Sequence, residues 1–342
     1  MSTHDYNYTR RGFMPLLRDI FIHLSENDML NEATKKVGLR FGADKVVGGI
    51  KVEDTIERIK DLNGQGMGVT FDNLGEFITE KSEALQEKSN IIEMIQAIDE
   101  HGLDAHGSIK LSQIGLHIDY DFCLQNMREI LTVAKQADMF INVDMENYAS
   151  YDDTIRLVDT LREEFDNVGT VIQSYLFNSR EDVIKYKDMR LRLVKGAYKE
   201  APEIAFQAKK DIDAAYMRLI KTHLLEGSGY TSIATHDHNI IEETIDFIKE
   251  NDIPEDTFEF QMLYGFRKDY QRNLVARGYR VIVYLPFGKD WYAYFMRRLA
   301  ERPQNLNLVL KGVTRDKRVQ TVAAVVAGTG ALLAAYKFIR NK

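Results

Sequence analysis

Polar side chains follow many of the short β-rich runs in this sequence, at positions where α/β proteins commonly place reactive groups. In order along the chain they are Lys110, Asp144, Gln173, Arg192, Lys195, Thr235, His236, Gln261 and Tyr284. Any one of them alone is typical of a solvated strand end. If the runs are parallel strands of one sheet, however, all of these side chains meet at the same edge, which favours a functional site there.

A second group of polar residues lies near residue 300, within a segment of helical period. Tyr294, Arg297, Arg298 and Glu301 stand at positions i, i+3, i+4 and i+7, so they share one helix face. The alternative is an ordinary polar surface stripe. Two adjacent guanidiniums with a carboxylate to orient them would instead form a forked clamp for a substrate carboxylate.

Other chemistries are open at this point. His236 and His238 flank Asp237, but a metal site would need further ligands and Asp144 is the only obvious carboxylate, so no metal is predicted. Lys110 or Lys195 would serve as the Schiff-base nucleophile of a barrel lyase or aldolase, given a desolvated or electropositive site. A barrel that binds ligands without turnover is the third interpretation.

The elements that must position these groups alternate between β-rich runs and segments of helical period, which predicts repeated βα units around a parallel sheet. The expected strands are 68–71, 107–112, 140–145, 170–176, 190–196, 231–236, 258–263 and 280–286. The first intervening helix is expected over 80–100, with Ile91, Ile92, Ile95 and Ile98 on its apolar face. Eight such units without a glycine-rich first turn favour a closed (β/α)₈ barrel.

Composition limits the class of protein further. The chain has 342 residues, of which 44% are hydrophobic and 28% charged, as in a globular protein. Its net charge of −7 has no basic stripe, so nucleic acid is not an expected partner. The single cysteine, Cys123, excludes an internal disulfide, and the first twenty residues lack the apolar core of a secretory signal, so we expect a cytoplasmic enzyme.

Several blocks resemble the signature segments of the proline dehydrogenase family. They are GSIKLSQIG (107–115), INVDMEN (141–147), RLVKGAY (192–198), ATHDHN (234–239), FEFQMLYGFR (258–267) and YLPFGKDWYAYFMRRLAER (284–302). Six blocks in the right order, over about 68–303, make this resemblance specific. It implies a distorted (β/α)₈ barrel that holds FAD at the C-terminal strand ends and oxidises L-proline to 1-pyrroline-5-carboxylate.

The resemblance also implies a role for each matching residue on the substrate side. Arg297 and Arg298 match the pair that binds the proline carboxylate, Lys110 assists them, and Glu301 and Asp144 hold these cations in place. Tyr284 and Tyr294 match aromatic residues that close over the ring, and Leu193 and Tyr198 match further pocket wall. Tyr284 is expected to disfavour hydroxyproline, and together with Arg192 and Asp144 it is a predicted catalytic residue.

On the cofactor side, the resemblance places Arg192 beside flavin N5. The other implied flavin contacts are Gln173, Lys195, Gly196, Thr235, His236 and Gln261, with Lys209 near the phosphates. Lys199 stands where the family usually has an aromatic residue, so this loop departs from the pattern. The implied electron acceptor is a membrane quinone, and we expect a single-activity enzyme that leaves the next oxidation to another protein.

Four segments are expected along the chain. Residues 1–67 are predicted to form helices that pack on the barrel, starting with the apolar residues between Leu16 and Leu24, and residues 68–303 the barrel itself. A basic linker (304–318) precedes an apolar C-terminal helix (319–337), in which 319–336 carries no charge. That length is at the short end of the roughly 17–25 residues of a bilayer span, so the prediction is a marginal anchor at the inner face of the cytoplasmic membrane.

Overall fold

The computed structural model describes residues 43–75 and 78–301, and the chain divides into two compact units. One unit is Val52–Leu285, and the other comprises Met1–Lys51 and Pro286–Lys342. The expected helix around Leu16–Leu24, the linker 304–318 and the apolar helix 319–337 lie outside the described residues.

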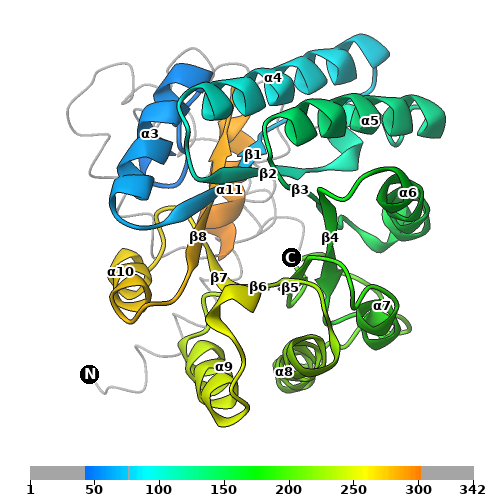
Figure 1. Ribbon diagram of the computed structural model, residues 1–342. Coiled ribbons are helices and arrows are strands. Elements are labelled where there is room, and N and C mark those ends of the chain that lie inside the picture. Colours follow the sequence, from blue (N-terminus) through cyan, green and yellow to red (C-terminus); the bar gives the residue numbers. More distant parts are fainter. Residues whose placement is uncertain (1–42, 76–77, 302–342) are drawn as a thin grey trace, which may run out of the picture. The chain divides into compact units, whose positions relative to one another are not determined.

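The strands of the first unit form a closed barrel in which each strand pairs in parallel with the next one along the chain (Figure 1). Their bounds are β1 (Gly68–Asn73), β2 (Ala105–Ile109), β3 (Ile141–Val143), β4 (Val168–Gln173), β5 (Leu191–Val194), β6 (Thr231–Ala234), β7 (Phe258–Leu263) and β8 (Val281–Phe287). The predicted eight-stranded (β/α)₈ barrel is thereby confirmed.

Helices connect the strands and cover the outside of the barrel (Figure 1). They are α3 (Val52–Gly64), α4 (Lys81–Glu100), α5 (Tyr120–Gln136), α6 (Tyr151–Glu164), α7 (Ser179–Lys185), α8 (Lys209–Glu226), α9 (His238–Glu250) and α10 (Lys268–Ala276), with 3-10 turns η3 (Leu111–Ile114), η4 (Tyr148–Ser150) and η5 (Glu255–Thr257). Helix α3 precedes β1, and each of the others lies in sequence where the chain must return from the end of one strand to the start of the next.

Local sequence explains where these helices begin and which face they bury. The expected helix over 80–100 is α4, and the Glu83 carboxylate accepts the backbone N–H of Glu80 at 3.2 Å just before its first turn. In α5 the N-cap Asp119 accepts the backbone N–H of Phe122 at 3.0 Å. Helix α9 buries Ile241, Ile245 and Ile248, which recur at helical spacing.

Several strands end earlier than the β-rich runs predict, because other contacts replace the ladder. After β2, the carboxylate of Glu146 accepts the backbone N–H of Ser112 at 3.0 Å and its hydroxyl at 2.6 Å, which starts η3 in place of more strand. After β5, Gly196 has φ +107°, a conformation that only glycine adopts readily. A Cβ there would lie 2.3 Å from the ring of Tyr175.

The barrel interior is polar along much of its length, which is unusual for a closed barrel of this size. Alternate residues of the strands contribute buried hydroxyl, amide and charged groups, among them Thr70, Ser108, Arg192, Ser232, Glu259 and Gln261. Such groups are stable in a protein interior only when they are hydrogen-bonded to one another. The strands therefore place a connected polar network inside the barrel, at positions where most (β/α)₈ barrels have aliphatic side chains.

The described part of the second unit contains the 3-10 turn η2 (Ala43–Lys45) and helix α11 (Trp291–Glu301). Two backbone hydrogen bonds join its halves: Gly48 donates to Pro286 at 2.7 Å, and Gly288 donates to Gly49 at 3.0 Å. Trp291, 1% exposed, packs its ring against that of Phe295, 6.1 Å away. The two backbone hydrogen bonds thus tie the segment just before α11 to Gly48 and Gly49.

Candidate active site

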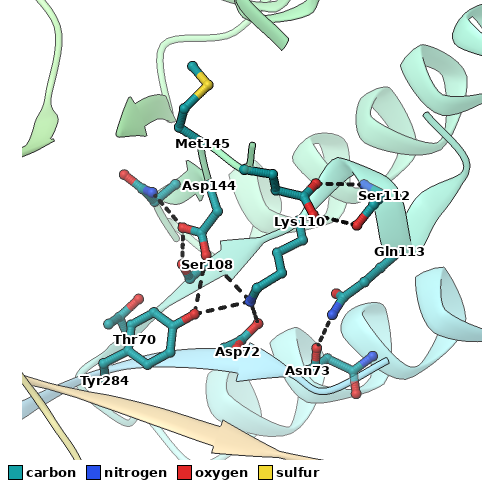
Figure 2. A network of polar contacts seen from close by, with 12 residues as sticks. Thr70, Asp72, Asn73, Ser108, Lys110, Ser112, Gln113, Asp144, Met145 and Tyr284 are labelled. Carbon is teal, nitrogen blue, oxygen red and sulfur yellow. Dashed lines mark hydrogen bonds and ion pairs between the residues drawn. The ribbon is translucent and has the colours of Figure 1, made fainter. Parts of the chain in front are cut away.

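Asp144, directly after β3, lies at the centre of a network of side chains from several strands of the barrel (Figure 2). Its Oδ1 accepts hydrogen bonds from Ser108 Oγ at 2.6 Å and from Asn142 Nδ2 at 3.2 Å. Its Oδ2 accepts the hydroxyl of Tyr284 at 3.2 Å. The carboxylate is thus held on both oxygens, and its orientation is fixed before any ligand binds.

The ammonium of Lys110 lies beside this carboxylate (Figure 2). Its Nζ donates to Asp72 Oδ1 at 2.6 Å and to the hydroxyl of Tyr284 at 3.2 Å, and it is 3.6 Å from Oδ2 of Asp144. Burial alone would lower the pKa of Lys110, but the charge of Asp72, with Tyr284 and Asp144, outweighs it and holds that pKa well above its usual value. Lys110 is therefore a fixed cation.

The two carboxylates of the network differ in their affinity for protons. Burial raises the pKa of Asp72, and the charge of Lys110 only partly offsets this effect. Burial also opposes ionisation of Asp144, yet the charges of Arg192 and Lys110 outweigh it and lower the pKa of Asp144. Asp144 is consequently the more firmly ionised of the two.

Arg192 of β5 reaches across the barrel interior and is 4% exposed. Its Nε donates to Gln261 Oε1 at 2.7 Å, and its NH2 donates to Thr70 Oγ1 at 3.0 Å. Its NH1 donates to Ser108 Oγ at 2.7 Å and to Asp144 Oδ1 at 2.8 Å. A guanidinium held by so many neighbours cannot swing away, so the site contains a preorganised positive charge.

A second group of charges follows β5 and β6. The Nζ of Lys195 donates to Asp213 at 2.6 Å and to Asp237 at 2.9 Å. Lys209, at the start of α8, also pairs with Asp213, and its Nζ lies 3.5 Å from Asp237. The side chain of Lys209 is 76% exposed, so its ammonium is accessible to an anion that approaches this end of the barrel.

The remaining cofactor candidates lie at the same strand ends. Gln173 of β4 donates through Nε2 to the carbonyl of Glu146 at 2.7 Å. The hydroxyl of Thr235 accepts the backbone N–H of Asp237 at 3.1 Å. His236 Nε2 accepts the backbone N–H of Leu263 at 3.3 Å. Each therefore has a defined orientation, set by backbone groups of a neighbouring loop or strand.

Two predicted pocket residues stand apart from this network. Leu193 has no exposed surface, and its carbonyl accepts the hydroxyl of Tyr216 from α8 at 2.9 Å. Tyr198 is 40% exposed and lies in the segment between β5 and α8. That segment is tied to the chain after β4 by the antiparallel bridge between Leu176 and Ala205. Their role in a substrate pocket stays a prediction.

The two histidines considered as metal ligands have different partners. His236 bonds the backbone of β7, whereas the ring of His238 packs 4.6 Å from that of Tyr270 in α10. In residues 43–75 and 78–301 there is no group of three or more His, Cys, Asp and Glu side chains that could hold a metal ion.

Helix α11 of the second unit carries the other predicted residues. Tyr294 is buried, Arg297 and Arg298 are partly buried, and the guanidinium of Arg298 lies 5.1 Å from the ring centre of Tyr294. Glu301 is the last residue of the helix. The helical segment expected from the spacing of these residues is present, and their contact with substrate stays a prediction.

Sequence reasoning missed several residues of the network. Asp72 lies beyond the predicted end of the first strand at Phe71, because β1 is two residues longer than the β-rich run predicts. Thr70 and Ser108 lie inside their strands, and a small hydroxyl residue in a strand is no specific signal. Asp72 was detectable as a charged residue that continues the β-rich run GVTFDN.

A family described as proline dehydrogenase matches residues 55–310. Proline dehydrogenase 1 of Bacillus subtilis subsp. natto is 45% identical over 302 residues, which are 88% of this chain and 100% of that protein. Proline dehydrogenase of Deinococcus radiodurans is 42% identical over 280 residues, or 80% and 90% of the two chains.

Among solved structures, proline utilization A from Bdellovibrio bacteriovorus superposes with a TM-score of 0.74 at 23% identity. The match covers 90% of this chain but 39% of that protein. It supports the barrel fold.

Proposed function

The chain belongs to the proline dehydrogenase family, and from this we propose that it oxidises L-proline to 1-pyrroline-5-carboxylate with FAD as cofactor and a quinone as electron acceptor. The observation that carries the proposal is Arg192: a buried guanidinium fixed by four hydrogen bonds at the C-terminal strand ends of a closed barrel. A preorganised cation at that position would stabilise negative charge that develops on a neighbouring electron acceptor.

The residues present fit a flavin dinucleotide. The four bonds of Arg192 leave one of the five N–H groups of a guanidinium for a ligand. Lys195 and Lys209, whose charges are balanced by Asp213 and Asp237, supply ammonium N–H donors for a diphosphate. Gly196 adopts a backbone conformation that lets the chain pass close to Tyr175. We assign Gln173, Thr235, His236 and Gln261 to the rest of the cofactor site. When bound, the flavin supplies the two-electron acceptor for the oxidation.

The charge balance of the barrel network bears on how the substrate binds. Lys110 and Arg192 are matched by two carboxylates, Asp72 and Asp144, so the network alone has little net charge to attract the proline carboxylate. The additional cations are proposed to be Arg297 and Arg298, assisted by Lys110 and oriented by Glu301. Tyr284 and Tyr294 would close over the ring, with Leu193 and Tyr198 as further wall.

The reaction removes two electrons and two protons from proline as the ring C–N bond becomes a C=N bond. With the amine bound in its neutral form, its remaining proton is lost to water after oxidation, so no strong base is required. Asp144 is poorly suited to accept a proton because its pKa is lowered. The role left to Asp144 is to hold Arg192 and Tyr284.

A Schiff-base lyase is not favoured. Its nucleophile must be a neutral amine at working pH, which requires a depressed pKa. The pKa of Lys110 is instead raised well above its usual value, mainly by Asp72, and Lys195 is paired with two aspartates.

The simplest test is spectroscopic. Purified protein loaded with FAD should show flavin absorption, and anaerobic addition of L-proline should bleach it. Borohydride should trap no carbonyl substrate on Lys110 or Lys195. A protein that binds flavin but is not bleached by proline would contradict the proposed reaction. It would favour a barrel that binds ligands without turnover.

The quinone acceptor motivates a proposal for the C-terminal segment 319–337. We propose that this segment, with basic residues on both sides, holds the enzyme at the inner face of the cytoplasmic membrane. No helix in the described part of the chain has the length and hydrophobicity of a bilayer span. Truncation after Arg318 should keep dye-linked proline oxidation and move the protein from the membrane to the supernatant. A full-length protein that is monomeric and wholly in the supernatant without detergent would contradict this.

A further inference from the structure

Glu259 of β7 is a buried carboxylate, 1% exposed, to which the proposed reaction assigns no role. Its Oε1 accepts three hydrogen bonds: from Gln261 Nε2 at 2.6 Å, from Ser232 Oγ at 2.7 Å and from Arg190 NH2 at 2.8 Å. Burying a charge in this way costs free energy unless the charge is fully paired. A carboxylate inside the barrel therefore calls for an explanation beyond packing.

The position of Glu259 follows from the strand geometry. Residues two apart on a strand point to the same face, so Glu259 and Gln261 both face the barrel interior. Ser232 is the register partner of Glu259 on β6, and Arg192 is the register partner of Ser232 on β5. Glu259 thus lies two strands from Arg192 along one row of register partners, and the side-chain amide of Gln261 bonds to both.

The amide of Gln261 has two neighbours that each accept only one orientation. The carboxylate oxygen of Glu259 that pairs with Arg190 accepts hydrogen bonds, and Nε of Arg192 can only donate one. Both are satisfied when the amide NH₂ faces Glu259 and the carbonyl faces Arg192, where Oε1 lies 2.7 Å from Nε. A flipped amide would place oxygen against carboxylate and N–H against N–H.

The carbonyl of Gln261 is the partner of Nε, whereas Ser108, Asp144 and Thr70 hold NH1 and NH2. Without a fixed acceptor at Nε, the guanidinium plane is free to tilt about its contacts at the other two nitrogens. The tilt would redirect the N–H group that is left for a ligand. Glu259 therefore influences the orientation of the Arg192 guanidinium through Gln261, although Glu259 and Arg192 are not hydrogen-bonded to each other.

We propose that Glu259 is a positioning residue: it fixes the amide of Gln261 so that Arg192 presents its cationic N–H at the angle the bound flavin requires. The relay is Glu259 to Gln261 to Arg192. The identity of the ligand rests on the proposed function, whereas the orientation of Gln261 and Arg192 rests on the contacts above.

The first test compares Glu259→Gln with Ser232→Ala. The first variant removes the acceptor-only neighbour that, together with Nε of Arg192, fixes the amide orientation. The second removes a neutral bond to the same carboxylate oxygen and leaves the relay intact. We expect Glu259→Gln to lower kcat for proline about tenfold with KM changed less than about twofold, and to make the potential of the bound flavin more negative. Ser232→Ala should change each quantity by less than about twofold.

A double-mutant cycle tests whether Glu259 acts through Gln261. Gln261→Met removes the amide, so adding Glu259→Gln to that variant should change kcat and the flavin potential little further. If the two substitutions instead lower kcat by the product of their separate effects, the relay is overturned.

If Glu259→Gln fails to fold, a second variant tests the same relay. The exchanged pair Glu259→Gln with Gln261→Glu keeps one amide and one carboxylate, with the acceptor still facing Arg192. That variant should recover kcat to within about threefold of wild type, and a loss as large as about tenfold would overturn the proposal.

A readout on cofactor-free protein separates this proposal from the proposed function. Exchange of the Arg192 Nε–H with solvent, followed by NMR of arginine-labelled protein, should be about tenfold faster in Glu259→Gln and unchanged in Ser232→Ala. Equal exchange in all three proteins would refute the relay even if the enzyme oxidises proline. Faster exchange in a protein that binds no flavin would keep the relay and refute the proposed function.

Discussion

The hydroxyl of Tyr284 lies 3.2 Å from Oδ2 of Asp144. The same ring lies 5.3 Å from the guanidinium carbon of Arg192, so Tyr284 is held at its tip by a carboxylate and on its face by a cation. A side chain fixed in this way gives the site a wall of defined position.

That wall predicts a change of substrate preference. Tyr284→Ser should raise kcat/KM for hydroxyproline relative to proline about tenfold, since it makes room for a ring hydroxyl and removes packing from the smaller substrate. Tyr284→Phe is the matched control, because it keeps the ring and loses the bond to Asp144. Its ratio should stay near that of the wild type. An unchanged ratio in the serine variant would remove Tyr284 from a specificity role.

The proposed carboxylate clamp predicts separate effects on substrate and cofactor. Arg297→Met or Arg298→Met should raise KM for proline at least about tenfold, since a hydrogen bond to a charged group contributes about 1.5–3 kcal/mol. The Kd of FAD should change little. Arg272→Met on α10, where the side chain is 56% exposed, should alter neither constant. A wild-type KM in both clamp variants would contradict the assignment.

The pair formed by Asp72 and Lys110 predicts a shift in the pH profile. In Asp72→Asn the largest influence that raises the pKa of Lys110 is lost while burial remains, so that pKa should fall. As pH rises, kcat/KM for proline should then decline at lower pH than in the wild type. Asp104→Asn, which breaks the pair with Arg280, serves as the control and should leave the profile unchanged. A profile for Asp72→Asn that overlays the wild type would contradict the role of Asp72.

Buried His223 of α8 predicts how stability depends on pH. Its Nδ1 lies 2.7 Å from Thr231 Oγ1, and burial lowers its pKa from 6.5 to about 4. Between these values the unfolded chain binds a proton that the folded protein does not, so stability is lost as pH falls from 6.5 through about 4. At pH 4.5 the loss due to His223 is roughly 2–3 kcal/mol.

In His223→Gln the decrease in unfolding free energy between pH 7 and pH 4.5 should therefore be smaller by about that amount, as measured by urea denaturation. His101→Gln, at an exposed position after α4, should keep the wild-type decrease. An equal decrease in all three proteins would show that His223 is not the group responsible. His106 has a pKa lowered in the same direction by burial, so some pH dependence should remain.

The sequence predicted the barrel well because its strands are short apolar β-branched runs between segments of helical period. It predicted strand ends poorly, since these depend on contacts between distant residues. Glu146 captures the backbone of Ser112 from another loop, and Gly196 turns the chain beside Tyr175. Neither contact has a local sequence signal.

For the site, the rule that polar residues gather at C-terminal strand ends identified Lys110, Asp144, Arg192, Gln261 and Tyr284, which lie in one connected network. It did not identify partners inside the strands, because a buried threonine or serine looks like any other strand residue. The orientation of Arg192 could not be predicted either, since it is set jointly by groups on other strands.

Closure of the barrel has a consequence for how the protein folds. Lys110 and Tyr284 are 174 residues apart in sequence, and Arg280 pairs with Asp104 across 176 residues. During synthesis β1 cannot pair with β8 until β8 has left the ribosome, so the barrel closes last. Contacts between residues so far apart in sequence slow folding. Until then β1 is an open sheet edge that invites aggregation. We therefore expect spontaneous refolding to be slow and to benefit from chaperones, with the ability to bind ligand appearing in the last phase.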